Sequence, residues 1–189
     1  MNVKSLATGL GAVLMVLLGV VSFASPSWAY LQDDVDMLLE LRDCPVCILN
    51  EADLSGEDFA QVNLKIAELT DADLSQSNLN EANLMLAELG GANLSEANLV
   101  GAAMNGARLQ GANLSGADLT GVVLTQANID GANLQGANLQ DAELTAAVIG
   151  NADWRGANLK GANLRGAIWS EAILCNTVLP DGTVGDRNC

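Results

Sequence analysis

Large apolar residues recur at every fifth position along most of this chain. From Leu49 to Leu174, 26 consecutive five-residue units each have a large apolar residue at the centre, without insertion or deletion. Twenty of these centres are Leu, and Ala lies two positions before the centre in 21 units, so the pattern predicts one regular repeat. The other centres are Phe59, Met104, Ile129, Ile149, Trp154 and Trp169.

Neither a helix nor a strand can use a period of five. Five helical residues advance about 500°, so successive Leu side chains would spread around the helix. Five strand residues would place successive Leu side chains on opposite faces of a sheet. The pattern is typical of a solenoid, in which each unit forms one side of a coil, apolar side chains point to a common axis and backbone groups bond between coils.

The consensus of the repeat is A-(N/D)-L-x-G, as in Ala112-Asn113-Leu114-Ser115-Gly116. This sequence resembles the pentapeptide-repeat family over about 130 residues. The resemblance implies an all-β solenoid, a right-handed quadrilateral β-helix with four units and twenty residues in each coil. On that geometry the 26 units make about 6.5 coils, and strands about 4.8 Å apart would give a rod roughly 31 Å long.

A twenty-residue coil places residues twenty apart in one column, so Ala112, Ala132 and Ala152 are expected to stack inside the rod. The aromatic centres lie near the two ends of the repeat. We expect Phe59, Trp154 and Trp169 to be core plugs and not cofactor contacts.

The first 29 residues have the order of a secretory signal peptide. Lys4 is followed by an apolar run over residues 10–24, and Ser27 and Ala29 are small residues suited to a cleavage site after Ala29. The apolar run is short for a membrane span. We therefore expect export, with no membrane insertion after cleavage.

The remaining chain divides into three parts: an N-terminal helix cap over residues 30–46, the β-helix over residues 47–176 and a C-terminal cap over residues 177–189. Leu31, Val35 and Leu38 have helical spacing, and Pro180-Asp181-Gly182 predicts a turn. Exported cyanobacterial members of the pentapeptide-repeat family have similar ends. This resemblance implies the thylakoid lumen or the periplasm.

The four cysteines allow three pairings. Cys44 and Cys47 precede the repeat while Cys175 and Cys189 follow it, so a rod roughly 30 Å long separates the pairs by more than a disulfide can span. We therefore expect disulfides Cys44–Cys47 and Cys175–Cys189, which export would permit. Cys44-Pro45-Val46-Cys47 also matches a C-x-x-C redox motif, but it follows the end of a predicted helix, whereas catalytic pairs usually begin one.

The composition argues against several function classes. The chain has no His and a net charge of −15, with 15 acidic and 2 basic residues over residues 30–96. Nucleic-acid binding by phosphate neutralisation is therefore not expected, and we expect no catalytic, cofactor or metal site. Arg155, Lys160 and Arg165 follow consecutive centres and form a basic collar, which allows a monomer or a weak end-to-end oligomer.

A few outward repeat positions, where polar residues are expected, hold apolar residues instead. Ile66 and Leu86 lie twenty residues apart and are expected to stack, next to Met85 and near Glu68 and Glu88. Contiguous exposed apolar residues can mark a partner surface. These five residues are the candidate contact for an unidentified protein partner.

Three functions remain open. The first is a non-enzymatic exported scaffold or protein-interaction module on a rigid acidic rod. The second is a redox-responsive accessory protein that uses the Cys44–Cys47 pair. The third, implied by some members of the pentapeptide-repeat family, is a DNA-mimicking topoisomerase inhibitor, which the signal peptide argues against.

Overall fold

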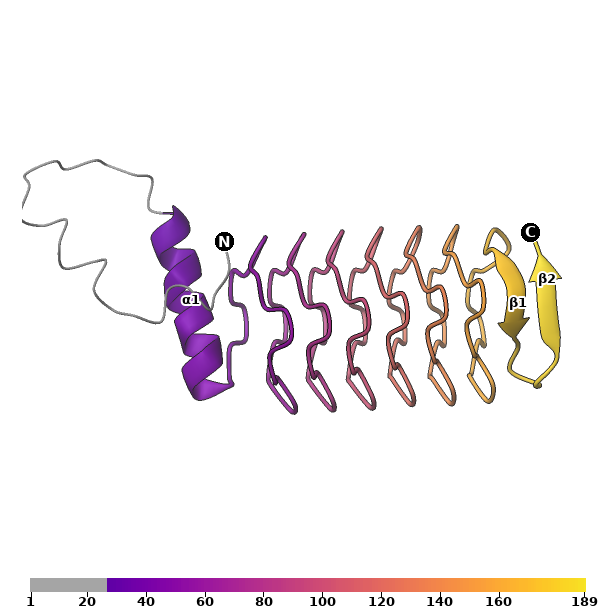
Figure 1. Cartoon of the computed structure of the whole chain (residues 1–189), viewed down its shortest axis with the longest axis horizontal. Helices are drawn as coiled ribbons and strands as arrows, with labels where there is room; N and C mark the ends of the chain where they lie inside the picture. Colours follow the sequence, from indigo (N-terminus) through magenta and orange to yellow (C-terminus); the bar gives the residue numbers. More distant parts are fainter. Residues whose placement is uncertain (1–26) are drawn as a thin grey trace, which may run out of the picture.

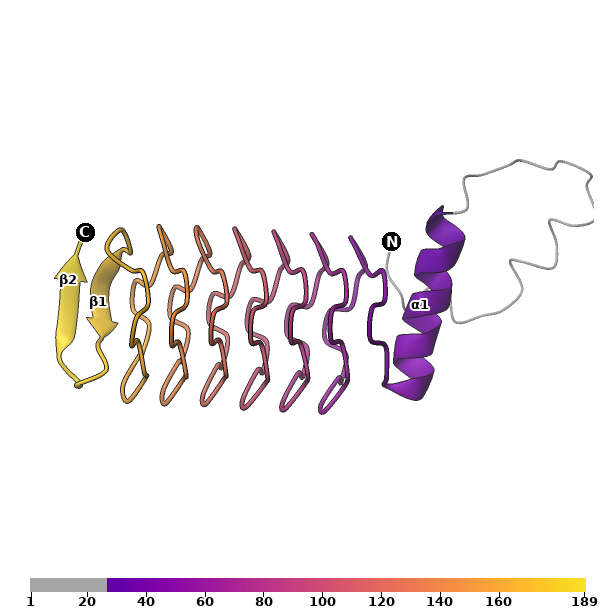
Figure 2. The same cartoon turned by 180° about the vertical axis from the view of Figure 1, so that it is seen from behind.

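The computed structural model describes residues 27–189, which form an elongated rod (Figure 1). Helix α1 (Ser27–Leu41) lies at one end, and a hairpin of β1 (Leu174–Val178) and β2 (Val184–Arg187) lies at the other. Between them the chain winds through stacked coils, which Figure 2 shows from behind. Of the predicted signal peptide, residues 1–26 lie outside the described residues. Within residues 27–189, no helix has the length and apolarity needed to cross a membrane.

Each coil takes twenty residues and bonds to the next coil. Parallel bridges join residues that are twenty apart, from Asp43↔Asn63 to Asn158↔Val178. Between two middle coils, the Leu94 N–H donates to the Asn113 carbonyl (2.7 Å), and the Asn113 N–H donates to the Ala92 carbonyl (2.9 Å). Because four five-residue units complete one turn, each unit forms one side of a four-sided coil.

The core is a continuous column of small and aliphatic side chains along the axis of the rod. Ala112, Ala132 and Ala152 are at most 1% exposed, and Leu114 and Leu134 at most 2%. One hydrophobic cluster extends from Val35 to Leu174. Burial of this apolar surface is the main force that holds the coils together.

The corners of the coils require left-handed backbone. The residue two positions after the centre has a positive φ in most units, with 68° at both Gly111 and Gly116. Glycine adopts this conformation readily because it has no Cβ. Where another residue occupies a corner, the conformation is strained, and strain is greatest for a β-branched side chain.

The asparagine side chains that form rows on the outside of the rod are hydrogen-bonded to other groups of the protein. The Asn93 Oδ1 accepts a hydrogen bond from the Ser95 N–H (3.3 Å) and another from the Asn113 Nδ2 (3.2 Å). The Asn133 Nδ2 in turn donates to the Asn113 Oδ1 (3.0 Å). These amides join successive coils, so the row stabilises the stack.

Helix α1 closes the N-terminal end of the core. Val35 and Leu38 are 5% and 0% exposed and belong to the same hydrophobic cluster as the coils. The Asp34 carboxylate accepts a hydrogen bond from the Ile48 N–H (2.6 Å). The helix is therefore joined to the first coil by both apolar and polar contacts.

The coils begin earlier than the sequence division proposed. α1 ends at Leu41, and the first bridge pairs Asp43 with Asn63, inside the segment assigned to the N-terminal cap (residues 30–46). The reason is that Cys44, five residues before Leu49, occupies a buried centre position at 0% exposure. Its N–H donates to the Asn63 carbonyl (2.8 Å), as at the later centres.

The C-terminal hairpin leaves its end of the core partly open. β1 and β2 are antiparallel, with Thr177 opposite Gly185. Phe59 and Trp154 are buried at 2% and 1% exposure, whereas Trp169 is only partly buried against the core. Trp169 thus packs against the core less completely than Phe59 and Trp154, because no further complete coil follows it.

Candidate interaction surface

Three exposed aliphatic residues occupy the same corner of the first three coils, and we call Val46, Ile66 and Leu86 the aliphatic ladder. Backbone bonds join these coils at this corner: the Val46 N–H donates to the Lys65 carbonyl (2.9 Å), and the Ile66 N–H donates to the Met85 carbonyl (2.9 Å). The structure thus places Ile66 and Leu86 in one column, as their spacing of twenty predicts, and adds Val46.

The ladder residues are exposed and conformationally strained. Val46, Ile66 and Leu86 are 64%, 43% and 49% exposed, with φ values of 67°, 62° and 59°. Left-handed backbone costs an L-residue about 1–2 kcal/mol, and Val and Ile are outliers there. Neither burial nor backbone preference explains these three residues. Non-glycine residues also adopt left-handed backbone at other corners, such as Gln61 and Glu81, so the ladder is distinguished by its exposed aliphatic side chains.

Gly106 ends the ladder in the fourth coil. A Cβ at this residue would lie 2.8 Å from the Leu86 Cδ2, so the Leu86 side chain extends over the space that the glycine leaves open. The next residue of the column, Gln126, is polar. The apolar surface therefore ends after three coils.

Acidic residues flank the ladder. Glu68 and Glu88 are paired by a parallel bridge, on the side of the coil that follows the ladder corner. The Arg108 guanidinium contacts Glu88 (2.7 Å), whereas Glu68 accepts a hydrogen bond from the neutral Asn50 amide (3.0 Å). Lys65, on the other side of the corner, is the nearest basic residue in the sequence. The surface combines aliphatic and acidic groups.

The sequence analysis found part of this surface. It identified Ile66, Met85 and Leu86. Ile66 and Leu86 are exposed in the structure, whereas Met85 is partly buried. It missed Val46 and Ile48, which are 64% and 45% exposed. The repeat spacing could have found Val46, because it lies twenty residues before Ile66, but the repeat was taken to begin at Leu49.

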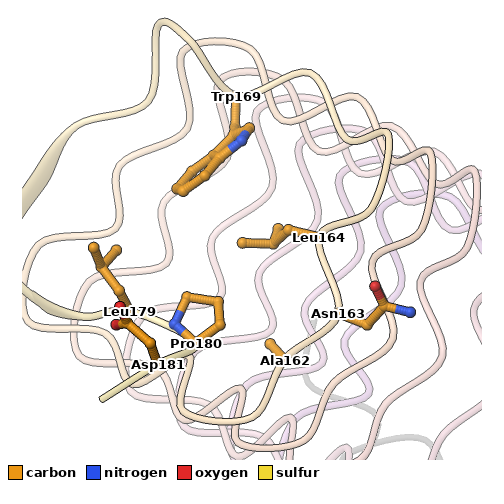
Figure 3. A pocket seen from close by; sticks show the side chains of 7 residues that line it. All are labelled: Ala162, Asn163, Leu164, Trp169, Leu179, Pro180 and Asp181. Carbon is orange, nitrogen blue, oxygen red and sulfur yellow. The ribbon is translucent and has the colours of Figure 1, made fainter. Parts of the chain in front are cut away.

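A second candidate surface is a hollow of about 400 Å³ at the C-terminal end (Figure 3). Leu164, Trp169, Leu179 and Pro180 form its apolar walls, and Asp181 lies at its edge. These side chains surround the open end of the core, where the hairpin replaces a further coil. We interpret the hollow as a consequence of incomplete closure.

Contacts of two residues hold the end of the chain against this part of the rod. The Arg187 side chain donates a hydrogen bond to the Trp169 carbonyl, and its guanidinium carbon lies 5.0 Å from the centroid of the Trp169 ring. The Asn188 Nδ2 donates to the Ala172 carbonyl (3.0 Å). The C-terminal segment is thus fixed over the last coil.

The four cysteines lie in two pairs, each with a Cα–Cα distance of 5.5 Å, and each pair is joined as a disulfide. Cys44 and Cys47 are 0% and 2% exposed, whereas Cys175 is partly buried and Cys189 is exposed. A redox partner must reach a sulfur atom. The burial of Cys44 and Cys47 is therefore typical of a structural pair.

Part of the basic collar is paired within the chain. Arg155 contacts Asp153 at 2.5 Å, and this hydrogen bond holds the pKa of the Asp153 carboxyl below its ordinary value. Lys160 and Arg165 are exposed. Within residues 27–189, no group of three or more His, Cys, Asp and Glu side chains could hold a metal ion.

The fold and its surface define a β-solenoid repeat protein with an exposed aliphatic corner. The pentapeptide repeats family matches the chain in 8 copies, over residues 47–85, 67–106, 87–126, 102–141 and 142–181. The chain therefore belongs to the pentapeptide-repeat family, whose members form right-handed quadrilateral β-helices.

Solved structures of pentapeptide-repeat proteins are similar to the chain. HetL from the cyanobacterium Nostoc sp. PCC 7120, involved in the regulation of heterocyst differentiation, is 31% identical, with 76% of this chain and 83% of HetL covered and a TM-score of 0.35. A protein of the Arabidopsis thaliana thylakoid lumen is 33% identical, with 61% and 66% covered and a TM-score of 0.23.

QnrB1, a plasmid-mediated fluoroquinolone resistance protein, is 20% identical, with 76% of this chain and 80% of QnrB1 covered and a TM-score of 0.47. No curated protein sequence matches the chain.

Proposed function

We propose that this chain is an exported, non-enzymatic protein-interaction module, in which a rigid acidic rod presents the aliphatic ladder to a partner protein. The single observation that carries the proposal is the ladder itself. Three successive coils place Val46, Ile66 and Leu86 in exposed, left-handed positions, where a glycine or polar residue would be more stable. Members of the pentapeptide-repeat family are generally structural or interaction proteins.

The rod of this proposal has about 6.5 coils and is capped by α1 at its N-terminal end. Bridges between residues twenty apart, from Asp43 to Val178, support at least this many coils, and the burial of Leu38 supports the capping role of α1. Such a rod keeps the ladder residues at fixed spacings. A rigid surface binds with a smaller loss of conformational entropy than a flexible one.

Export to the thylakoid lumen or the periplasm is part of the proposal. The signal-peptide pattern of residues 1–29 supports export, and so do the two cysteine pairs at disulfide distance. The alternatives receive less support. Burial of Cys44 and Cys47 disfavours redox exchange. A topoisomerase inhibitor would have to act in the cytoplasm, from which the signal peptide would export the protein.

Affinity capture tests the proposed function. The purified protein and the variants Leu86→Lys and Ile168→Lys are used to capture proteins from lumenal or periplasmic extract. Ile168 is 60% exposed but lies outside the ladder, so its variant is the matched control. We expect Leu86→Lys to lose a partner that Ile168→Lys retains, with unchanged thermal unfolding for both. Equal capture by all three proteins would reject the ladder as the binding surface.

A further inference from the structure

We propose that the partner of the aliphatic ladder is a basic amphipathic α-helix that lies along the rod axis. This inference rests on the proposed function, because it assumes that the ladder binds a protein. It specifies the secondary structure, direction and charge of the bound segment. Three observations support it: the bonding of the corner backbone, the spacing of the ladder and the charge around it.

The backbone N–H groups at the ladder are not free to pair with an added strand. The N–H groups of Val46, Ile66 and Leu86 already donate to carbonyls of the following coil, at 2.9, 2.9 and 3.0 Å. A partner strand that paired edge to edge with this corner would have to break those bonds. The partner therefore binds through side chains, and the three aliphatic side chains are its contacts.

The spacing of the ladder matches a helix better than a strand along the axis. Successive coils of a β-helix are about 4.8 Å apart. A helix presents one row of side chains per turn of about 5.4 Å, so its rows stay within about 1 Å of the ladder over two steps. Same-face residues of a strand are about 6.8 Å apart and would be about 4 Å out of register after two steps.

The length of the ladder limits the length of the bound helix. The apolar column begins at Val46 in the first coil and ends at Leu86, whose side chain extends over Gly106. Beyond it Gln126 is polar. A helix with apolar residues at i, i+4 and i+7 has as many rows as the ladder, so the contact needs only about two turns of helix.

Charge selects a basic partner. Glu68 and Glu88 flank the ladder. Arg108 pairs with Glu88, but residues 30–96 as a whole contain 15 acidic and 2 basic residues. A second copy of this chain would bring acidic residues against acidic residues, and its helix α1 contains four acids and no base. An anionic membrane surface is disfavoured for the same reason. Lys or Arg beside the apolar row of the partner helix would complement Glu68 and the negative charge of these coils.

Designed peptides test the inference on the purified full chain. The helical probe has Leu at i, i+4 and i+7 with Lys on both flanks, and the strand probe has the same composition with Leu and Lys alternating. A scrambled peptide controls for attraction to acidic protein in general. Fluorescence anisotropy at physiological ionic strength measures binding to the protein and to its variants Leu86→Gln and Ile168→Gln.

We expect the helical probe to bind more tightly than the strand and scrambled probes, and Leu86→Gln to weaken it about tenfold. Ile168→Gln is expected to leave its affinity unchanged. If the strand probe binds more tightly and depends on Leu86, the helix is rejected while the interaction surface stands. If no probe depends on Leu86, the inference is overturned, and capture with Leu86→Lys then decides the proposed function separately.

Discussion

The two ends of the rod close the same kind of core in different ways. At the N-terminal end, α1 covers the first coil, so that Leu38, Cys44 and Cys47 are at most 2% exposed. At the C-terminal end, the hairpin leaves Leu164 and Trp169 partly exposed around a hollow of about 400 Å³. A helix brings several side chains over an open coil, whereas a hairpin that continues the coil path covers little of it. Closure therefore depends on the capping element and not on the repeat.

Truncation of one leucine at each end should give the largest difference between them. Leu38→Ala removes a side chain that is 0% exposed, and we expect it to lower the free energy of unfolding by about 2–5 kcal/mol. Leu164→Ala removes a partly exposed side chain, and we expect a loss of about 1 kcal/mol. Chemical denaturation measures both. Equal losses would show that the two ends are equally closed.

The C-terminal disulfide is expected to be reduced more readily than the N-terminal one. Cys189 is exposed and Cys44 is buried, so a mild dithiol reductant should open Cys175–Cys189 well before Cys44–Cys47. Alkylation followed by peptide mapping gives the order. Loss of the C-terminal bond, whose cysteines are 14 residues apart, should cost up to about 3 kcal/mol in the chain-entropy model. Four reactive thiols in the untreated, denatured protein would contradict both bonds.

A substitution at the ladder corner should raise the free energy of unfolding, whereas truncation of a core residue lowers it. Ile66→Asn replaces a β-branched residue at φ 62° with one that tolerates left-handed backbone, so we expect about 1 kcal/mol more stability. The same change is expected to weaken partner binding. Gln126→Asn, at the same corner in a later coil, is the control and should change little. A destabilised Ile66→Asn protein would show that this side chain contributes to packing.

The smallest effect concerns the ion pair of the C-terminal half. The pKa of Asp153 is lowered by its hydrogen bond from Arg155, so the pair stabilises the fold above the unfolded-state pKa of about 4 and loses this contribution as the pH falls through the lower folded pKa. Arg155→Met should therefore lower the stability slightly near neutral pH and leave it unchanged in strong acid. Unfolding of both proteins across the acid range measures the difference. A difference that persists in strong acid would show that the Arg155 stem contributes by packing.

The sequence predicts the columns of the fold because each unit repeats the same local environment. The spacing of twenty placed Ala112, Ala132 and Ile66 without reference to distant contacts, and the structure agrees. The ends could not be predicted equally well, because their packing depends on one particular helix and one particular hairpin. Trp169 has the same repeat position as buried centres, yet it is only partly buried because no further complete coil follows it.

The candidate surface could also be predicted only in part. Ile66 and Leu86 were found because polar residues are expected at their outward positions. Val46 was missed because the repeat was taken to begin at Leu49, three residues after it. Its exposure follows from the first coil beginning at Asp43, a boundary that only the contacts with α1 and the second coil define.

Coil-to-coil pairing at intervals of twenty also limits how the length of this protein can change. An insertion of twenty residues between Ile66 and Leu86 would add one coil and leave both residues at the same corner. An insertion of five residues would preserve every Leu and Ala of the core and extend the rod by a quarter of a coil. It would nevertheless move Leu86 to the adjacent corner. The chain can thus grow in steps of five without losing its fold, but only in steps of twenty without dispersing the ladder.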